Sequence, residues 1–298
     1  MSIARPAALL LISVLFPPCG FAQAPAASGG SARAETPARR DRVPVDSNVA
    51  VHLRDGSVVY GRLERLDADS VIVLSTAGRL ALARSSVREV RDAGVAHRRG
   101  DGSVEYWFPN PHSSRLYFAP TGRTLGQGEG YFADHDIVVG SFAVGATDRI
   151  TLGGGGFLVP DSRAWFVTSK VGVVRGQDFN LAVGAIVGGW GTSETGGVGY
   201  VAGTFGGTDK ALTLAVGNGF TGSGLANDQV FMVGGEVRVS RRLSLLSENY
   251  LITGQSDAAV SYGVRFLGER TSVDLVFFNL VKNPLFPGFP FLGVAVKW

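Results

Sequence analysis

The residues best suited to chemistry in this sequence are few. Asp134, His135 and Asp136 follow one another, and carboxylates beside an imidazole can bind a metal ion or orient a catalytic base. Neighbouring residues of a strand point to opposite faces, so His135 cannot share a site directly with either aspartate. We therefore predict a solvated strand end here, and we expect no metal and no cofactor.

Two further patterns point away from catalysis. The four glycines at 153–156 lack the Lys-Ser/Thr pair and the helix start of a phosphate-binding loop, so they favour a glycine-rich strand. The sequence also contains no Gly-x-Ser-x-Gly nucleophile turn. We predict that the protein is not an enzyme.

Seven charged residues share a different pattern, because each falls by strand parity on the same face as small residues. They are Lys170, Glu236, Arg238, Glu248, Arg265, Asp274 and Lys297. Four are positive and three are negative. Such charges either set the field along a water-filled lumen or pair with opposite charges inside a filled one. The near balance of signs favours pairing slightly.

The elements that carry these residues are predicted to be strands. Thirty-three of the 42 glycines lie between residues 115 and 298, where apolar segments of about ten residues are separated by turn residues. We predict twelve strands, at 115–120, 131–144, 149–159, 163–174, 178–190, 197–205, 210–220, 229–239, 243–253, 258–267, 271–281 and 289–298.

Alternation within these segments gives two different faces. In 229–239, Phe231 and Val233 alternate with Gly234 and Glu236. An apolar face opposite a small, occasionally charged face suits a narrow barrel interior better than a soluble sandwich. The segment 243–253 is irregular because Leu246 and Glu248 share a face, so we expect a bulge or an error in the assigned register there.

The length and spacing of the segments indicate a membrane barrel. Transmembrane β-strands need about 9–11 residues and come in even numbers. Short turns recur about every 30 residues, with mostly longer loops between them, as in outer-membrane barrels. We predict an all-β protein with an antiparallel transmembrane β-barrel of about 12 strands (10–12) and both barrel ends in the periplasm. The seven charges then face the lumen, because on the lipid face each would be unfavourable by about 2–4 kcal/mol.

The N-terminal third has a different organisation. Residues 1–22 have the pattern of an export signal cleaved after Ala22, and Cys19 offers the less favoured alternative of lipid attachment. Residues 23–46 lack an apolar face and predict a disordered linker. Residues 47–95 predict a small five-stranded barrel in the periplasm, with strands at 49–54, 58–66, 70–75, 79–83 and 87–91. Residues 96–114 predict a second linker.

The run Val51-x-Leu-x-Asp-Gly-Ser, followed by Gly61 and Leu63, resembles an Sm-like or SH3-like module. Sm-like modules are known for RNA binding, but an exported chain meets no RNA. The pI near 9.2 reflects a net charge of only +3. We therefore expect no nucleic acid and a periplasmic protein as the partner of residues 47–95.

The C-terminal part resembles a group of Gram-negative outer-membrane barrel proteins to which no substrate is assigned. The similarity lies in 116–121, 128–131 and 147–155. Trp298 ends the last strand and is similar to the terminal aromatic residue that the barrel-assembly machinery reads in such proteins. The resemblance implies an outer-membrane location, with lipid and this machinery as partners.

Three functions follow from these patterns. We expect a pore or channel for small solutes that carries a periplasmic interaction module. The first alternative is a closed structural or anchoring barrel that presents the module to a partner. The second is a secreted soluble all-β binding protein.

Overall fold

The computed structural model describes residues 43–159, 163–190 and 195–298. These form two compact units, one ending at Pro109 and one beginning at Asn110, and each is described by itself. The expected export signal, Cys19 and residues 23–42 of the expected linker lie outside the described residues. Among the residues that are described, no helix is long and apolar enough to cross a bilayer.

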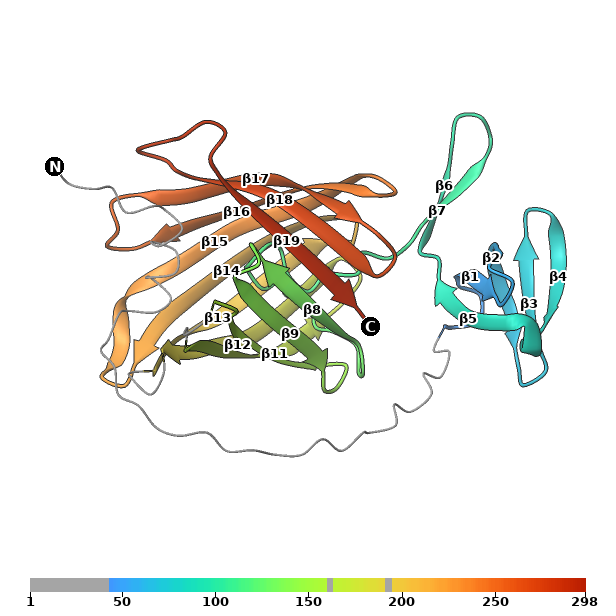
Figure 1. Ribbon diagram of the computed structural model, residues 1–298, viewed down its shortest axis with the longest axis horizontal. Helices are drawn as coiled ribbons and strands as arrows, with labels where there is room; N and C mark the ends of the chain where they lie inside the picture. The colour runs from blue at the N-terminus through green and yellow to red at the C-terminus, as the bar shows by residue number, and fades with distance from the viewer. Residues whose placement is uncertain (1–42, 160–162, 191–194) are drawn as a thin grey trace. The chain divides into compact units, whose positions relative to one another are not determined.

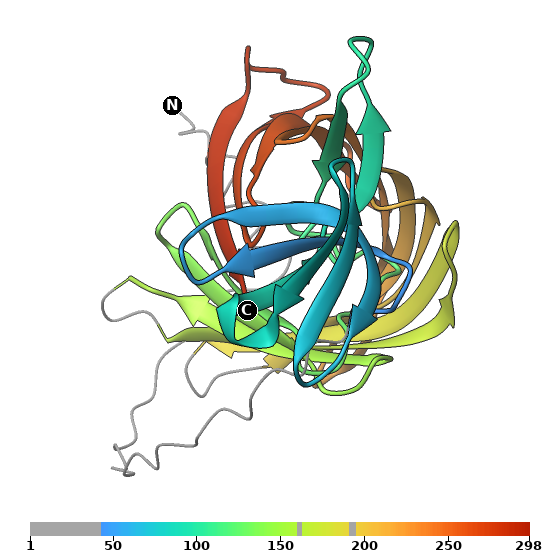
Figure 2. The same cartoon turned by 90° about the vertical axis from the view of Figure 1, so that its right-hand side faces the viewer.

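The first unit contains a five-stranded antiparallel sheet (Figure 2), with strand order β4-β3-β2-β1-β5. Its strands are β1 (Asn48–Leu53), β2 (Val58–Leu66), β3 (Ser70–Ser75), β4 (Gly78–Ala83) and β5 (Val87–Asp92), with a short 3-10 turn η1 (Arg84–Ser86) before β5. The five expected strands are confirmed to within one residue at each end. Val49, Val51, Leu63, Val71 and Val73 form its fully buried core.

The turn between β2 and β3 is fixed by Asp67. Its carboxylate accepts hydrogen bonds from the backbone amides of Ser70 and Asp69 at 2.7 and 3.1 Å. The bond from Ser70 is the largest effect that lowers the pKa of Asp67. The turn therefore keeps its charged acceptor.

A hairpin follows where a linker is expected. Residues 95–98 (β6, Val95–Arg98) pair with 104–107 (β7, Val104–Trp107) around a turn in which Gly102 has a φ of +83°. His97 stacks on Trp107 with ring centroids 4.0 Å apart. Part of the segment expected to be a linker is therefore a hairpin, whose two four-residue strands are too short to show a clear period.

The second unit is a closed barrel of twelve antiparallel strands (Figure 1), in the order β10 through β19 followed by β8 and β9. The strands are β8 (Gly130–His135), β9 (Val139–Gly145), β10 (Ile150–Phe157), β11 (Ala164–Arg175), β12 (Phe179–Trp190), β13 (Thr195–Gly206), β14 (Lys210–Thr221), β15 (Gly224–Ser240), β16 (Leu243–Ile252), β17 (Ala258–Leu267), β18 (Thr271–Leu280) and β19 (Phe289–Lys297). Trp298 N donates to Gly130 O at 2.9 Å where β19 meets β8. The predicted twelve-stranded barrel is confirmed.

Two errors cancel in that strand count. The expected strand 115–120 is not part of the wall and forms only one isolated bridge, between Arg115 and Pro120. The expected strand 131–144 is two strands, β8 and β9, joined by a tight turn. Asp136 and Ile137 adopt left-handed φ values of 57° and 60° there, without the glycine that usually marks such a turn.

The connections differ from the expected pattern at one position. At the end that holds the barrel termini they are short, as in 207–209 and 241–242. At the other end they reach eight residues in 281–288. The expected loop at 221–228 is instead a two-residue turn, 222–223, because β15 begins at Gly224 and extends the hairpin.

The two faces of the wall have opposite character. Large apolar side chains are exposed on the outer face, including Phe132 (51%), Phe142 (51%) and Phe266 (53%). The inner face is small and polar, and its buried residues include Ala133, Ala182, Ala202, Thr204, Thr213, Ser261 and Ser272. The alternation of period two therefore places most of the large apolar side chains outside, with Leu246, Val276, Phe278 and Phe291 as buried exceptions.

Candidate functional site

The lumen of the barrel is occupied by the segment that precedes β8. We call residues 110–129 the plug. Leu116, Tyr117, Thr121 and Leu125 of the plug are almost fully buried although they belong to no strand. The plug folds back on itself through a bond from Leu116 N to Ala119 O of 2.9 Å. Other polar groups of the plug bind side chains of the wall.

Glu248 on β16 holds the tip of the plug. Its carboxylate accepts backbone hydrogen bonds from Tyr117 (2.8 Å), Phe118 (3.0 Å) and Ala119 (3.0 Å). Tyr250 Oη donates to the other carboxylate oxygen at 2.5 Å. A buried carboxylate is tolerated only when it is well hydrogen-bonded, so the plug backbone and Glu248 depend on each other.

Arg265 on β17 forms the second contact with the plug. Its guanidinium binds Asp274 through two hydrogen bonds of 2.7 and 2.8 Å and Glu236 at 2.9 Å. Its Nη2 also donates to the carbonyl of Leu116 at 2.8 Å. Asn110 Nδ2 donates to the other oxygen of Glu236 at 2.9 Å. Arg115 of the plug approaches Asp274 at 3.9 Å, so the two wall carboxylates are balanced by one wall cation and one plug cation.

Lys170 on β11 binds the plug from another part of the wall. Its ammonium donates to the carbonyl oxygens of Ser114 (2.7 Å) and Thr121 (3.2 Å). Next to it, Gly122 N donates to Thr204 Oγ1 at 2.8 Å. A Cβ on Gly122 would collide with the carbonyl oxygen of Asn180, so glycine is required at this close approach.

Aromatic residues fill the space beside these polar contacts. Tyr117 packs in a cluster with Leu246, Val276, Phe278 and Phe291 of the wall. Leu246 faces inward beside Glu248 because Tyr117 covers it. The expected bulge at this point is wrong, since the register of β16 against β17 is the same on both sides.

His135 lies at the edge of the same cluster. Its ring packs edge-on against Tyr117 with centroids 4.9 Å apart, and it is only 7% exposed. The prediction of a solvated strand end is therefore wrong for this residue. Asp134 and Asp136 instead accept backbone amides of Ile137 (2.8 Å) and Leu292 (2.7 Å).

The backbone ladder between β16 and β17 is interrupted beside Glu248. Residues 247–249 of β16 lack paired residues on β17. The Ser261 hydroxyl accepts from Glu248 N (3.0 Å) and donates to Glu248 O (2.6 Å). Ser261 N in turn donates to Asn249 Oδ1 (3.0 Å), and Ser261 O accepts from Ser247 Oγ (2.7 Å). We call this break, satisfied by side chains, the seam.

The remaining predicted residues lie nearer the end that holds the barrel termini. Arg238 pairs with Asp209 at 3.0 Å and is buried. Lys297 pairs with Glu129, at the end of the plug, at 3.0 Å and is partly exposed. Trp298 is 48% exposed and follows β19. Of the seven charges, Glu248, Arg265 and Lys170 bind plug backbone directly.

Sequence reasoning missed the plug side of this site. Asn110, Arg115 and Tyr117 are buried in the lumen, and the one available signal was inward-facing Leu246, which requires an apolar partner. The described residues hold no group of three or more His, Cys, Asp or Glu side chains arranged for a metal ion. The arrangement holds the plug inside the barrel, and Glu248, Arg265 and Lys170 bind its backbone.

The Arg265 cluster should dominate barrel stability. In Arg265→Met, Glu236 remains buried without its cation and Asp274 keeps only the more distant Arg115, so we expect a loss of about 3–5 kcal/mol in the free energy of unfolding. Urea unfolding of the detergent-folded protein measures it. The double variant Arg265→Met/Glu236→Gln, which keeps Asp274 for Arg115, should recover part of the loss, and exposed Arg242→Met should change little. An unaffected Arg265→Met variant would contradict the proposed dependence.

Glu248→Gln should loosen the plug without removing its apolar contacts. The amide oxygen can still face the plug amides while the NH₂ faces the Tyr250 hydroxyl, but three charge-assisted hydrogen bonds become weaker neutral ones. We expect a single cysteine at position 114 (Ser114→Cys, in a Cys19→Ser chain) to react about tenfold faster with a water-soluble maleimide. Tyr250→Phe leaves the plug acceptor in place and should have a smaller effect. Equal labelling rates in all three proteins would exclude this role of Glu248.

No protein-family model and no curated protein matches the chain. Comparison with solved structures finds porins and other outer-membrane proteins at low identity. KdgM porin is 11% identical with a TM-score of 0.42, over 57% of this chain and 96% of the porin. Omp33 of Acinetobacter baumannii is 10% identical with a TM-score of 0.34, over 57% of this chain and 95% of Omp33. OmpF of Salmonella typhi is 9% identical with a TM-score of 0.31, over 84% of this chain and 95% of OmpF. Similarity this low assigns neither a solute nor a mechanism to this chain.

Proposed function

We propose that this protein is an outer-membrane β-barrel, closed by its plug, that anchors the N-terminal module at the periplasmic end. The membrane part of the proposal is supported by the outer face of the wall. Monomeric soluble proteins rarely expose apolar patches larger than a few hundred Å². The wall exposes large apolar side chains on consecutive strands, for example Leu212, Val233, Leu245, Phe266 and Leu275. A closed barrel also satisfies its backbone polar groups internally, which lipid requires.

The observation that carries closure is the set of wall charges bound to plug backbone. Glu248 holds three consecutive amides, and Lys170 and Arg265 hold three carbonyl oxygens of the same segment. In an open channel these charges would face water and passing ions. Here they fix a segment across the lumen, which favours the anchoring alternative over a permanently open pore.

The position of the plug supports the placement of the module. Asn110 enters the lumen beside Glu236, four residues before the end of β15, and the plug returns to Gly130 at the same end of the barrel. The barrel unit therefore begins, at Asn110, on the side of the short turns. If those turns face the periplasm, the module lies in the same compartment as periplasmic proteins. We therefore propose a periplasmic protein as its partner, since the Sm-like resemblance does not identify one.

A second candidate function is a gated channel. It is favoured by the composition of the inner face of the wall, where Thr204, Thr213, Ser261 and Ser272 are small and polar. A barrel that served only as an anchor could fill its lumen with apolar side chains. A wall of this kind becomes a polar lumen when the plug leaves.

The membrane location predicts heat-modifiable migration on a denaturing gel. A closed barrel that resists detergent at room temperature should run differently before and after boiling, and the protein should be found in the outer-membrane fraction. A protein recovered from the soluble periplasm, with a single unshifted band, would instead support the secreted soluble alternative.

Conductance separates a closed barrel from an open one. In planar bilayers the full chain should be silent or nearly so, because the plug occupies the lumen. Replacing residues 114–124 with Gly-Ser of equal length should produce steady ion conductance, because the polar wall then lines an unobstructed path. A Gly-Ser replacement of 282–288, outside the lumen, is the control. A full chain that conducts as well as the plug-replaced variant would overturn closure.

A further inference from the structure

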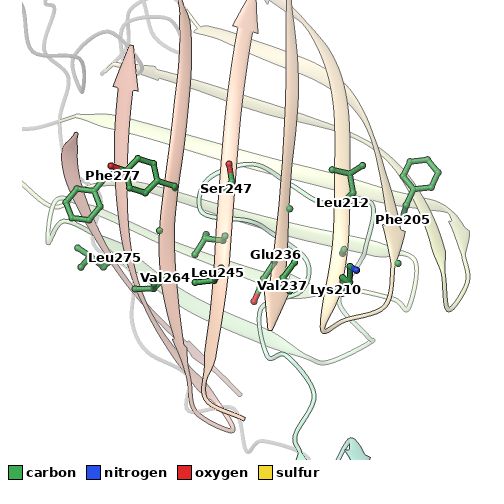
Figure 3. A pocket seen from close by; sticks show the side chains of 16 residues that line it. Phe205, Lys210, Leu212, Glu236, Val237, Leu245, Ser247, Val264, Leu275 and Phe277 are labelled. Atoms are coloured by element: carbon green, nitrogen blue, oxygen red, sulfur yellow. The ribbon is translucent and has the colours of Figure 1, made fainter. Parts of the chain in front are cut away.

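The outer face of the wall carries a groove across strands β13 to β18. Its volume is about 1010 Å³. Its floor is shaped by Gly235 and Ser247, which are paired on neighbouring strands and leave a gap among larger side chains. Figure 3 shows the apolar walls, which include Leu212, Leu245 and Val264. The groove is thus a local depression in the apolar belt.

The groove runs across the strands. Its lining follows a row of paired residues from Lys210 on β14 through Val237, Leu245 and Val264 to Leu275 on β18. Barrel strands are tilted by about 35–45° from the barrel axis, so a molecule in the groove lies oblique to the membrane normal. Tyr262 and Val237 line it between these ends. A flexible hydrocarbon chain matches this shape better than a rigid helix.

One end of the groove is cationic. Lys210, the first residue of β14, lines it and is exposed. It lies at the end of the barrel that holds the termini. The connections and strand ends there also carry Arg149, Arg175, Arg241, Arg242 and Arg270, which with Lys210 outnumber the acidic Asp148, Asp178, Asp209 and Glu269 of the same connections. The described connections at the opposite end carry Asp136 and Asp257 with Arg163 and Lys282, and so have no such excess. An apolar groove that ends at a lysine on a basic rim is complementary to an anionic amphiphile.

We propose that this groove binds one anionic phospholipid, with an acyl chain along Leu212, Leu245 and Val264 and the headgroup phosphate at Lys210. The inference rests on the proposed membrane location, because only then does lipid reach the outer face. It adds to the anchoring function a specific lipid site on the side where the module is placed. Its occupant follows from charge: one lysine at the end of an apolar groove is complementary to a single anionic headgroup that carries an acyl chain.

Native mass spectrometry of the detergent-extracted full chain tests the site. The protein is exposed to equal amounts of phosphatidylglycerol and phosphatidylcholine with identical acyl chains. We expect one phosphatidylglycerol to be retained in preference. Lys210→Gln should weaken that retention about fivefold, as expected for one basic residue facing an anionic headgroup. Lys282→Gln, at the opposite end of the barrel, should leave it unchanged.

A second pair of variants tests the acyl part of the site. Val264→Trp fills the groove and should abolish retention of both lipids, whereas Val294→Trp, outward on β19 and away from the groove, should not. Heat-modifiable migration shows that each variant is folded. Equal retention of the two lipids by the wild type, or equal loss in Lys210→Gln and Lys282→Gln, would overturn the proposal. A dimer that Val264→Trp dissociates would also overturn it, in favour of a second copy. Recovery of the protein in solution without detergent would contradict the proposed membrane location, and this outcome is distinct from failure of the lipid site.

Discussion

The structure depends on the closure of one sheet between β19 and β8. Once those strands pair, every wall strand has two neighbours and no edge is left to bind another chain. Closure also creates an inside, and twelve strands enclose more space than the small side chains of the inner face can fill. The plug is the physical consequence: a lumen too wide to be packed by alanine, threonine and glycine is filled by chain from outside the wall.

Charged side chains of the wall hold the plug in the lumen. Glu248 and Arg265 are buried on an inner face where an unpaired charge would be strongly unfavourable. Neighbouring wall residues satisfy part of the requirement, since Asp274 and Glu236 neutralise Arg265. The plug backbone satisfies the rest, with amides for the carboxylate and carbonyls for the cations. Wall and plug are therefore mutually dependent, and neither is a complete hydrogen-bonded structure without the other.

The sequence predicts the wall well because the signal is local. Alternation with period two identifies both the strands and the inward side of Lys170 or Asp274, with no knowledge of the partner strand. The plug is different, because Tyr117 and Glu248 are 131 residues apart and nothing local links them. The run from Leu116 to Phe118 is apolar enough to be taken for a strand. The β8–β9 turn is missed because it carries no glycine signal: its left-handed φ values occur at an aspartate and an isoleucine.

Glu248 takes part both in the seam and in the contact with the plug. Glu248 cannot complete its backbone ladder with β17 there, and Ser261 takes both of its backbone groups through one hydroxyl. The same residue uses its side chain to hold three amides of the plug. Polar side chains of β16 face outward at this point in an otherwise apolar belt, and the small Ser247 deepens the groove on the outer surface. The irregular part of β16 therefore acts on both sides of the wall. On the inside, Glu248 binds the plug, and on the outside the small Ser247 leaves the space in which a lipid chain fits.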